Sequence, residues 1–294
     1  MQKFLTIFTF FLCAAFQVQA QNILQYNMSI GDSYTIEQEA TQDIIQTMDG
    51  ADHEMKNTIL GEYVFEVISV TDSTFVMNFH FKSLLFKTES GIYGTLMDID
   101  TNREAEEDDI EANIFKGLLN NDLQIVVYKT GNIKTLTGTD AIIDSMLEKA
   151  GIEDDFTKNI AKKGLEKEFG DESMKESMIQ MLYLFSDEPV SKGSKWETSF
   201  NGDLKGSTTY SLQEYSTEEI KLVGDGPIEL NTVNEDVTMI LSGTQNVIAT
   251  CDTETGFMKN VTIEQTATGV TKTKQWGTVE VPTTINSTIT FKRI

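Results

Sequence analysis

Residues 139–185, with the sequence TDAIIDSMLEKAGIEDDFTKNIAKKGLEKEFGDESMKESMIQMLYLF, decide the fold because they form one long stretch of helical periodicity between segments of strand character. Capping residues and glycines divide this stretch into three consecutive helices. The predicted helices run from Thr139–Asp140 to Gly151, from Asp154–Asp155 to Gly170, and from Ser173 to Phe185. Ser173 and Glu176 have the spacing of a capping box, and Pro189 prevents continuation of the third helix.

Each predicted helix carries an apolar stripe at steps of three and four residues. The stripes are Ile142, Ile143, Met146, Leu147 and Ala150 in the first helix, Phe156, Ile160, Ala161, Leu165 and Phe169 in the second, and Met174, Met178, Met181, Leu182 and Phe185 in the third. Short amphipathic helices of this kind cannot bury their stripes alone. They therefore require a sheet to lie on, and the flanking sequence supplies strands on both sides.

The flanking segments read as strands, because apolar and polar residues alternate with period two. Phe75, Met77, Phe79 and Phe81 form the apolar side of one such strand. Strand character is predicted at 23–37 (two strands broken at Gly31-Asp32), 41–57 (a pair turning at Asp49-Gly50), 63–70, 74–81, 84–100, 123–137, 192–200, 208–215, 220–223, 237–241, 247–252, 257–265 and 283–291. A short helix through Ile114, Phe115, Leu118 and Leu119 is predicted behind the acidic segment 104–111.

These elements predict an α+β protein that is mostly antiparallel β. Two β-rich halves, 21–138 and 189–294, flank a central helical segment, 139–188, that packs on one face of the sheet. A curved sheet over helices compares, by analogy, with a half-barrel. The turn sequences at 31–34 and 193–196 echo one another, which favours two similar halves, although turns of similar composition also recur by chance. We expect 21–294 to be one structural unit.

The N-terminus has the pattern of a signal peptide over residues 1–20. Lys3 precedes an apolar run too short for a bilayer span, and Val18-Gln19-Ala20 is a small-x-small cleavage signal. Gln21 is the expected mature N-terminus. Cys13 is a poor lipid-anchor site, because Phe11 and Leu12 precede it where small residues are needed. The sequence therefore predicts export to the periplasm or the extracellular space.

Composition excludes several classes of function. Loss of Lys3 on cleavage takes the net charge from −23 to −24, which argues against nucleic acid or anionic lipid as a partner.

Cys251 alone would remain after cleavage, so no intramolecular disulfide is expected. Its strand parity with Val247 and Ala249 predicts a buried thiol.

Several pieces of the sequence resemble a domain-of-unknown-function family of secreted β-rich envelope proteins from Gram-negative bacteria. The matching pieces are the Gly-Asp-Ser-Tyr turn at 31–34, the hairpin at 130–133 that runs into 136–139, the segment 189–196 and the strand through Tyr210. The resemblance covers nearly the whole mature chain and implies an address in the cell envelope. It transfers no catalytic or binding residue.

The sequence lacks the residue combinations of common enzymes, and we expect a protein without catalytic activity and without a cofactor. Asp32-Ser33 follows a glycine as in one esterase family, but the last histidine is His80, so no downstream base exists. We interpret Asp32-Ser33 as a turn. With His53 and His80 as the two histidines, a zinc site of the usual kind is also not expected.

One acidic loop has the spacing of calcium ligands. Asp98, Asp100, Asn102 and Asp109 occupy positions one, three, five and twelve of such a loop. However, Arg103 stands at position six where glycine is usual, and position twelve is Asp instead of Glu. The alternative is a solvated acidic loop that binds calcium weakly or not at all.

The methionine-rich stripe of the third predicted helix gives the first hypothesis about function. Met174, Met178 and Met181, with Phe185, could line a ligand site between helices and sheet, because methionine adapts to varied apolar shapes. The alternative for these residues is ordinary core packing. We therefore expect an exported protein that binds an apolar or amphipathic ligand, with a structural or protein-interaction module of the envelope as the alternative. An apolar hollow of several hundred Å³ would favour ligand binding.

Overall fold

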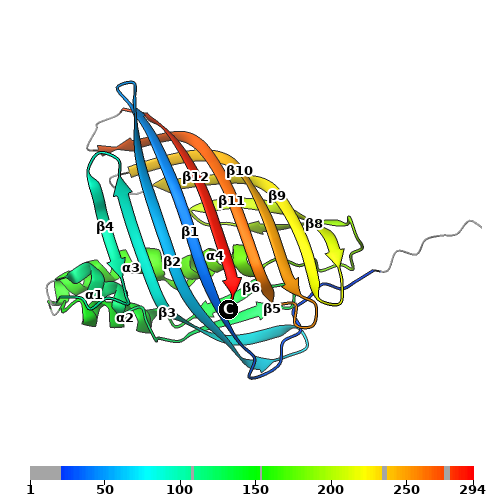
Figure 1. The fold of residues 1–294 in the computed structure, drawn as a ribbon. Helices are drawn as coiled ribbons and strands as arrows, with labels where there is room; N and C mark the ends of the chain where they lie inside the picture. Colours follow the sequence, from blue (N-terminus) through cyan, green and yellow to red (C-terminus); the bar gives the residue numbers. More distant parts are fainter. Residues whose placement is uncertain (1–20, 107–108, 153, 234–236, 275–278) are drawn as a thin grey trace, which may run out of the picture.

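The computed structural model describes residues 21–106, 109–152, 154–233, 237–274 and 279–294. The predicted signal peptide, residues 1–20, lies outside the described residues, together with Cys13 and Val18-Gln19-Ala20. Those residues form twelve strands in one antiparallel sheet and four helices that lie on it (Figure 1). The predicted fold class, mostly antiparallel β with helices packed on the sheet, is confirmed.

The strands are long, as the small number of prolines in the chain allows. They are β1 (Ser33–Met48), β2 (Ala51–Val70), β3 (Thr74–Ser90), β4 (Gly94–Asp100), β5 (Leu123–Tyr128), β6 (Ile133–Thr137), β7 (Lys195–Phe200), β8 (Leu204–Tyr215), β9 (Glu219–Val233), β10 (Val237–Asp252), β11 (Met258–Thr273) and β12 (Val281–Arg293). The helices are α1 (Ile110–Lys116), α2 (Thr139–Lys149), α3 (Asp155–Phe169) and α4 (Asp171–Leu182).

Strand order in the sheet follows the two halves of the chain. The order is β6-β5-β3-β2-β1-β12-β11-β10-β9-β8-β7, and β4 pairs with the far end of β3. Strands that precede the central helices therefore lie on one side, and strands that follow them lie on the other. The two sides meet where β1 pairs with β12, in a ladder from Ile36 opposite Arg293 to Gln46 opposite Thr283.

The sheet arches, and the helices lie on its concave side. Figure 1 shows the long strands passing over α4, with α1, α2 and α3 towards the β3–β4 edge. The strands continue beyond the level of the helices, so the helices cover part of the concave face. One large core fills the space between helices and sheet, and a smaller apolar cluster around Phe200, Leu241 and Ile285 lies further along the same face.

Predicted alternation and turn chemistry agree with the hairpins around β3. Phe75, Met77, Phe79 and Phe81 are all buried, as the period-two pattern predicted. Their rings pack against aromatic residues of β2; Phe79 lies 4.9 Å from Phe65 and 5.6 Å from Tyr63 between ring centroids. Both ring pairs are tilted, and aromatic contacts of this kind stabilise a core beyond the area they bury.

Several predicted strand boundaries are wrong. The segments 237–241 and 247–252 belong to one strand, β10, and β9 and β11 also run several residues past their predicted ends. The inward positions that interrupt the apolar pattern are small or amide residues, such as Gly243 and Gln245. Such residues are accommodated at inward positions of a sheet, but they interrupt the alternation of apolar residues from which strands are predicted.

The predicted first strand, within residues 23–30, is also wrong. This segment instead passes between two hairpins, where the Tyr26 N–H donates to the carbonyl of Lys129 at 2.7 Å and the Asn27 N–H donates to Thr255 at 2.8 Å. The Tyr26 hydroxyl donates to the Leu182 carbonyl at 2.8 Å, which satisfies a backbone acceptor at the end of α4. Leu24, Tyr26 and Met28 are buried, so this segment closes one end of the arch.

The helices agree in part with their predicted stripes. In α2 the predicted residues Ile142, Ile143, Met146 and Leu147 are buried. By contrast, α3 has no fully buried residue, because it packs mainly on α2 and α4. Leu165 and Phe169 of its stripe are half-buried against the large core, whereas Phe156 and Ile160 are 73% and 58% exposed. Helix α4 begins at Asp171, and the Ser173 hydroxyl donates to the Lys167 carbonyl and does not cap the helix.

The closed end of the arch predicts an unusually costly glycine substitution. Gly131 has φ of +94°, and a Cβ there would lie 1.7 Å from the Leu182 carbonyl oxygen, whereas Gly50 has φ of +80° and open space around it. Gly50→Ala should cost about 1–2 kcal/mol of backbone strain. Gly131→Ala should cost more than about 3 kcal/mol, since overpacking adds to the same strain.

Urea unfolding of both variants measures this difference. Equal losses of stability in Gly131→Ala and Gly50→Ala would contradict the close approach of the β5–β6 turn to the end of α4.

Candidate functional site

A hollow of about 400 Å³ lies between α4 and the concave face of the sheet. Its lining is mainly apolar and comes from β1, β2, β3, β12 and three helices. The lining residues are Gln38, Ile59, Tyr63, Phe79, Phe81, Leu84, Phe86, Phe115, Leu118, Glu168, Phe169, Met174, Ser177, Met178, Met181 and Phe291. The volume falls within the usual range of small-molecule sites, about 300–1,000 Å³.

The structure brings three of the four predicted ligand-binding residues together in this hollow. Met174, Met178 and Met181 lie on one side of α4 and contribute to the lining. Phe185 does not line it. It follows the end of α4, and its ring packs edge-on against Tyr26 at 5.4 Å in the closed end of the arch.

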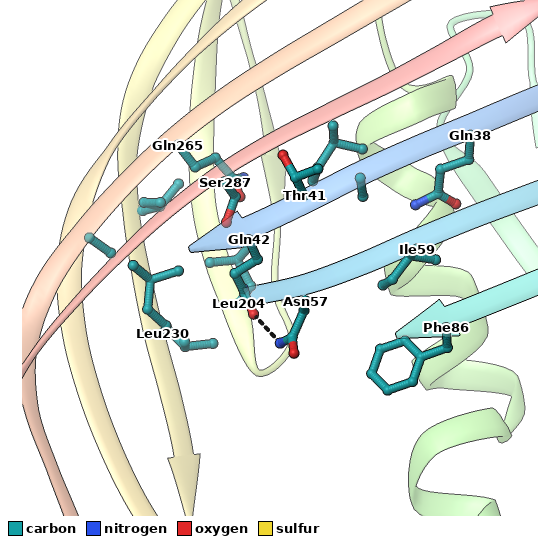
Figure 2. A pocket seen from close by; sticks show the side chains of 15 residues that line it. Gln38, Thr41, Gln42, Asn57, Ile59, Phe86, Leu204, Leu230, Gln265 and Ser287 are labelled. Atoms are coloured by element: carbon teal, nitrogen blue, oxygen red, sulfur yellow. Dashed lines mark hydrogen bonds between the residues drawn. The ribbon is translucent and has the colours of Figure 1, made fainter. Parts of the chain in front are cut away.

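A second hollow, of about 380 Å³, continues along the concave face beyond the helices. It shares Gln38, Ile59 and Phe86 with the first, so the two linings are continuous. Figure 2 shows the lining of this second hollow, with Gln38, Ile59 and Phe86 together on one side of it. Its other lining residues are Ala40, Thr41, Gln42, Asn57, Leu204, Ile228, Leu230, Gln265, Ala267, Ile285, Ser287 and Ile289. Together the two hollows form one groove, which we call the concave groove.

A row of polar side chains crosses the concave groove. Strand register places these residues opposite one another in succession: Thr88, Asn57, Gln42, Ser287, Gln265 and Gln245. We call this set the polar row. Along β11 and β10 it separates the large core from the smaller apolar cluster, because Ile263 and Val247 lie on one side of it and Ala267 and Leu241 on the other. The sequence analysis missed the polar row, since its members are far apart in the chain.

Hydrogen bonds link the polar row at both ends. On one side the Thr88 hydroxyl donates to Asn57, and the Asn57 amide donates to Gln42 Oε1, both at 2.9 Å. On the other side the Gln265 amide donates to Gln245 Oε1 at 3.0 Å, and the Gln245 amide donates to the Thr208 hydroxyl at 2.7 Å. Amides can be buried in an apolar face at low cost only when they are paired in this way.

The concave groove has little charge. Of the described lining residues, Glu168 is the one charged side chain, and no lysine or arginine is among them. The Tyr63 hydroxyl donates to Gln38 Oε1, and burial raises the pKa of Tyr63 well above its ordinary value. Tyr63 is therefore neutral at physiological pH and acts as a hydrogen-bond donor.

The predicted calcium ligands have other partners. Arg103 donates to Asp98 at 2.9 Å and to Asp100 at 3.1 Å, while Asp109 caps α1 by accepting from the Ala112 N–H at 3.0 Å. Asn102 donates its backbone N–H to Asp100 Oδ1 at 2.9 Å. The arginine at position six thus supplies the positive charge that a calcium ion would bring. Across the described part of the chain, no group of three or more His, Cys, Asp or Glu residues is arranged to hold a metal ion.

The residues considered for catalysis lie apart from the groove. The Asp32 carboxylate accepts from the Ser29 N–H at 2.8 Å and from the Tyr34 hydroxyl at 3.2 Å, in a turn before β1. His80 pairs with Asp122 at 3.2 Å at the surface. Cys251 is buried, as predicted, and burial raises the pKa of its thiol to about 12.

The fold and the groove define an open antiparallel sheet that arches over helices and holds an apolar hollow beneath it. The chain belongs to a family of unknown function, DUF6263, whose model matches residues 72–258. This agrees with the sequence resemblance to a family without a characterised member. No curated protein matches the sequence. Within the described residues, no helix has the length and apolar character needed to cross a bilayer.

Among solved structures, lipovitellin, reported for its lipid–protein interactions, shares the fold with a TM-score of 0.51 at 12% identity. The alignment covers 91% of this chain and 25% of the lipovitellin chain, so the protein spans about a quarter of that length. The COG4313 outer membrane channel from Pseudomonas putida F1 gives a TM-score of 0.26 at 7% identity, with 92% of this chain and 98% of that chain covered. The translocator domain of the autotransporter NalP from Neisseria meningitidis gives 0.24 at 9%, with 92% and 91% covered.

The hollow lowers the loss of stability expected when Met178 is replaced by alanine. Met178 faces the hollow, so part of its surface lacks the partner atoms of a closed core, and Met178→Ala should cost about 1–2 kcal/mol. Met146 on α2 is fully buried and does not line the groove, and Met146→Ala should cost about 2–5 kcal/mol.

Chemical denaturation of both variants tests this comparison. A loss for Met178→Ala as large as that for Met146→Ala would mean that the methionine stripe is ordinary core.

Proposed function

We propose that this protein binds a lipid in the concave groove, between the sheet and α4, and acts without catalysis. The observation that carries the proposal is the continuous apolar groove, with hollows of about 400 and 380 Å³ that share lining residues. A closed core of close-packed side chains would leave few voids larger than a water molecule. Hollows of this size on a half-covered concave face suit an acyl chain.

The lining chemistry supports an apolar or amphipathic ligand. Met174, Met178 and Met181 offer flexible side chains that adapt to a chain of variable shape, and Phe86 and Phe169 offer broad apolar surfaces. The arched sheet shared with lipovitellin, a protein whose structure was described for its lipid interactions, supports the same class of ligand.

The absence of catalytic combinations from the sequence supports a binding role over an enzymatic one. No histidine or cysteine is among the described lining residues of the groove, because His80 and Cys251 lie outside it. The signal-peptide pattern of residues 1–20 supports an envelope address, where lipids are exchanged between membranes and soluble carriers.

A protein-interaction module is the second candidate, and one observation favours it. Phe156 and Ile160 on α3 stay exposed next to one another at helical spacing, as an apolar strip for a partner would. In that case the concave groove would have no role in binding.

A groove-filling substitution separates the two candidates. Ser177→Trp places a large ring in the hollow beside α4, whereas Glu172→Trp adds the same ring at an exposed position of the same helix. Wild type should bind the uncharged fluorescent probe Nile red saturably at one site. Ser177→Trp should weaken that binding at least about tenfold, because the ring occupies apolar volume that the probe needs.

The Glu172→Trp variant is the control and should bind like wild type. No saturable binding by wild type, or equal binding by both variants, would reject the lipid-binding proposal.

The proposed address has its own test. N-terminal sequencing of the protein exported by its own host should begin at Gln21, because Val18-Gln19-Ala20 meets the specificity of signal peptidase. An N-terminus at a lipid-modified Cys13 would instead identify a lipoprotein, and an intact Met1 would reject export by this signal.

A further inference from the structure

The two hydrogen-bonded chains of the polar row end at three adjacent residues. Ser287 lies opposite Gln42 on one side and opposite Gln265 on the other. Figure 2 shows these three side chains next to one another in the wall of the groove. All three line its second hollow. We call them the central triad.

Each chain leaves a different group at its inner end. On the β3 side, the amide of Asn57 donates to Gln42 Oε1, so the Gln42 amide N–H groups remain as donors. On the β10 side, the Gln265 amide donates to Gln245 and also to Gln180 Oε1 at 3.3 Å, so Gln265 Oε1 remains as an acceptor. Within the described chain, neither these two groups nor the Ser287 hydroxyl makes another side-chain hydrogen bond.

The free groups of Gln42, Ser287 and Gln265 lie among apolar side chains in the groove wall. Gln265 is 9% exposed and lies between Ile263 and Ala267 on the inward face of β11. Gln42 and Ser287 are half-buried, and among the described residues Thr273 Oγ1 is the one buried side-chain oxygen or nitrogen without a partner, so the free groups of the triad face the open groove and its water. A ligand that displaces this water must offer matching hydrogen bonds. The groove wall thus presents three groups in one line across neighbouring strands: the Gln42 amide as a donor, the Ser287 hydroxyl, and Gln265 Oε1 as an acceptor. Neighbouring strands are about 5 Å apart.

The central triad suits an uncharged polar group. A carboxylate or phosphate would need a positive partner, and no lysine or arginine lines the groove among the described residues. An ester or amide carbonyl can accept from the Gln42 amide, and a hydroxyl a few ångströms away can donate to Gln265 Oε1. Ser287 can serve either group, because a hydroxyl both donates and accepts.

We propose that the central triad recognises the uncharged head of an acyl lipid that carries both a carbonyl and a free hydroxyl, as a monoacylglycerol does. The acyl chain then lies in the methionine-lined hollow beside α4, which is continuous with the triad through Gln38, Ile59 and Phe86. This inference rests on the proposed function, since it names the class of lipid for the same groove.

Displacement of Nile red by three ligands of equal chain length tests the inference. The ligands are monooleoylglycerol, oleate and octadecene, each added at submicellar concentration. Monooleoylglycerol should displace the probe at a concentration at least about tenfold lower than either of the others, because it alone offers an uncharged carbonyl and a hydroxyl. Oleate would bring an unpaired negative charge, and octadecene would leave the triad without a partner.

A double substitution, Gln42→Met with Gln265→Met, keeps side-chain length and removes the donor and the acceptor. It should weaken monooleoylglycerol about tenfold or more and leave octadecene unchanged. Gln124→Met, at an exposed position on β5, is the matched control and should leave all three ligands unchanged. Ser287→Ala removes a single hydroxyl, should weaken monooleoylglycerol severalfold, and serves where the double variant does not fold.

The outcomes separate this inference from the proposal beneath it. Equal displacement by oleate and monooleoylglycerol, or unchanged monooleoylglycerol affinity in both the double variant and Ser287→Ala, overturns the role of the triad while Nile red binding upholds the groove. Absence of saturable Nile red binding to wild type overturns the lipid-binding proposal itself.

Discussion

The antiparallel ladder between β1 and β12 is the interaction on which the rest of the structure depends. It joins the strands before the central helices to the strands after them and turns two smaller sheets into one arch. Both strands also line the middle of the concave groove, with Gln42 and Ser287 opposite one another. A groove that spans the two halves of the chain therefore exists only because the first and last strands pair.

Packing changes along the concave face from closed to open. At one end the N-terminal segment fills the arch, and Tyr34 stacks on Phe257 with 3.9 Å between ring centroids. Further along, α4 replaces that segment, and its methionines leave a hollow against β3. Beyond the helices the polar row gives way to the smaller apolar cluster. Aromatic packing thus holds the strands together at one end of the arch. The N-terminal segment and the helices leave the other end of the concave face uncovered.

The sequence predicted the local structure well where turn chemistry and alternation are strong. The turn at Asp49-Gly50 and the aromatic alternation of β3 were readable, because each depends on neighbours in the chain. The prediction failed where a residue's role depends on distant strands. Gly243 and Gln245 interrupt the apolar alternation of β10, so two strands were predicted there instead of one. A strand was also predicted within 23–30, but this segment forms its hydrogen bonds with two hairpins that are distant in the sequence. For the site, the methionine stripe was predictable from helical spacing. The polar row was not, since only strand register brings Gln42, Ser287 and Gln265 together.

Pairing of the first strand with the last also sets an order for folding. β1 can form its hairpin with β2 as soon as both are synthesised, but its other edge stays without a partner until Val281–Arg293 emerges from the ribosome. Contacts of such long range slow folding and prolong exposure of an unpaired strand edge. A chain built this way completes its arch only once β12 is available to pair with β1, and it gains its groove at the same moment.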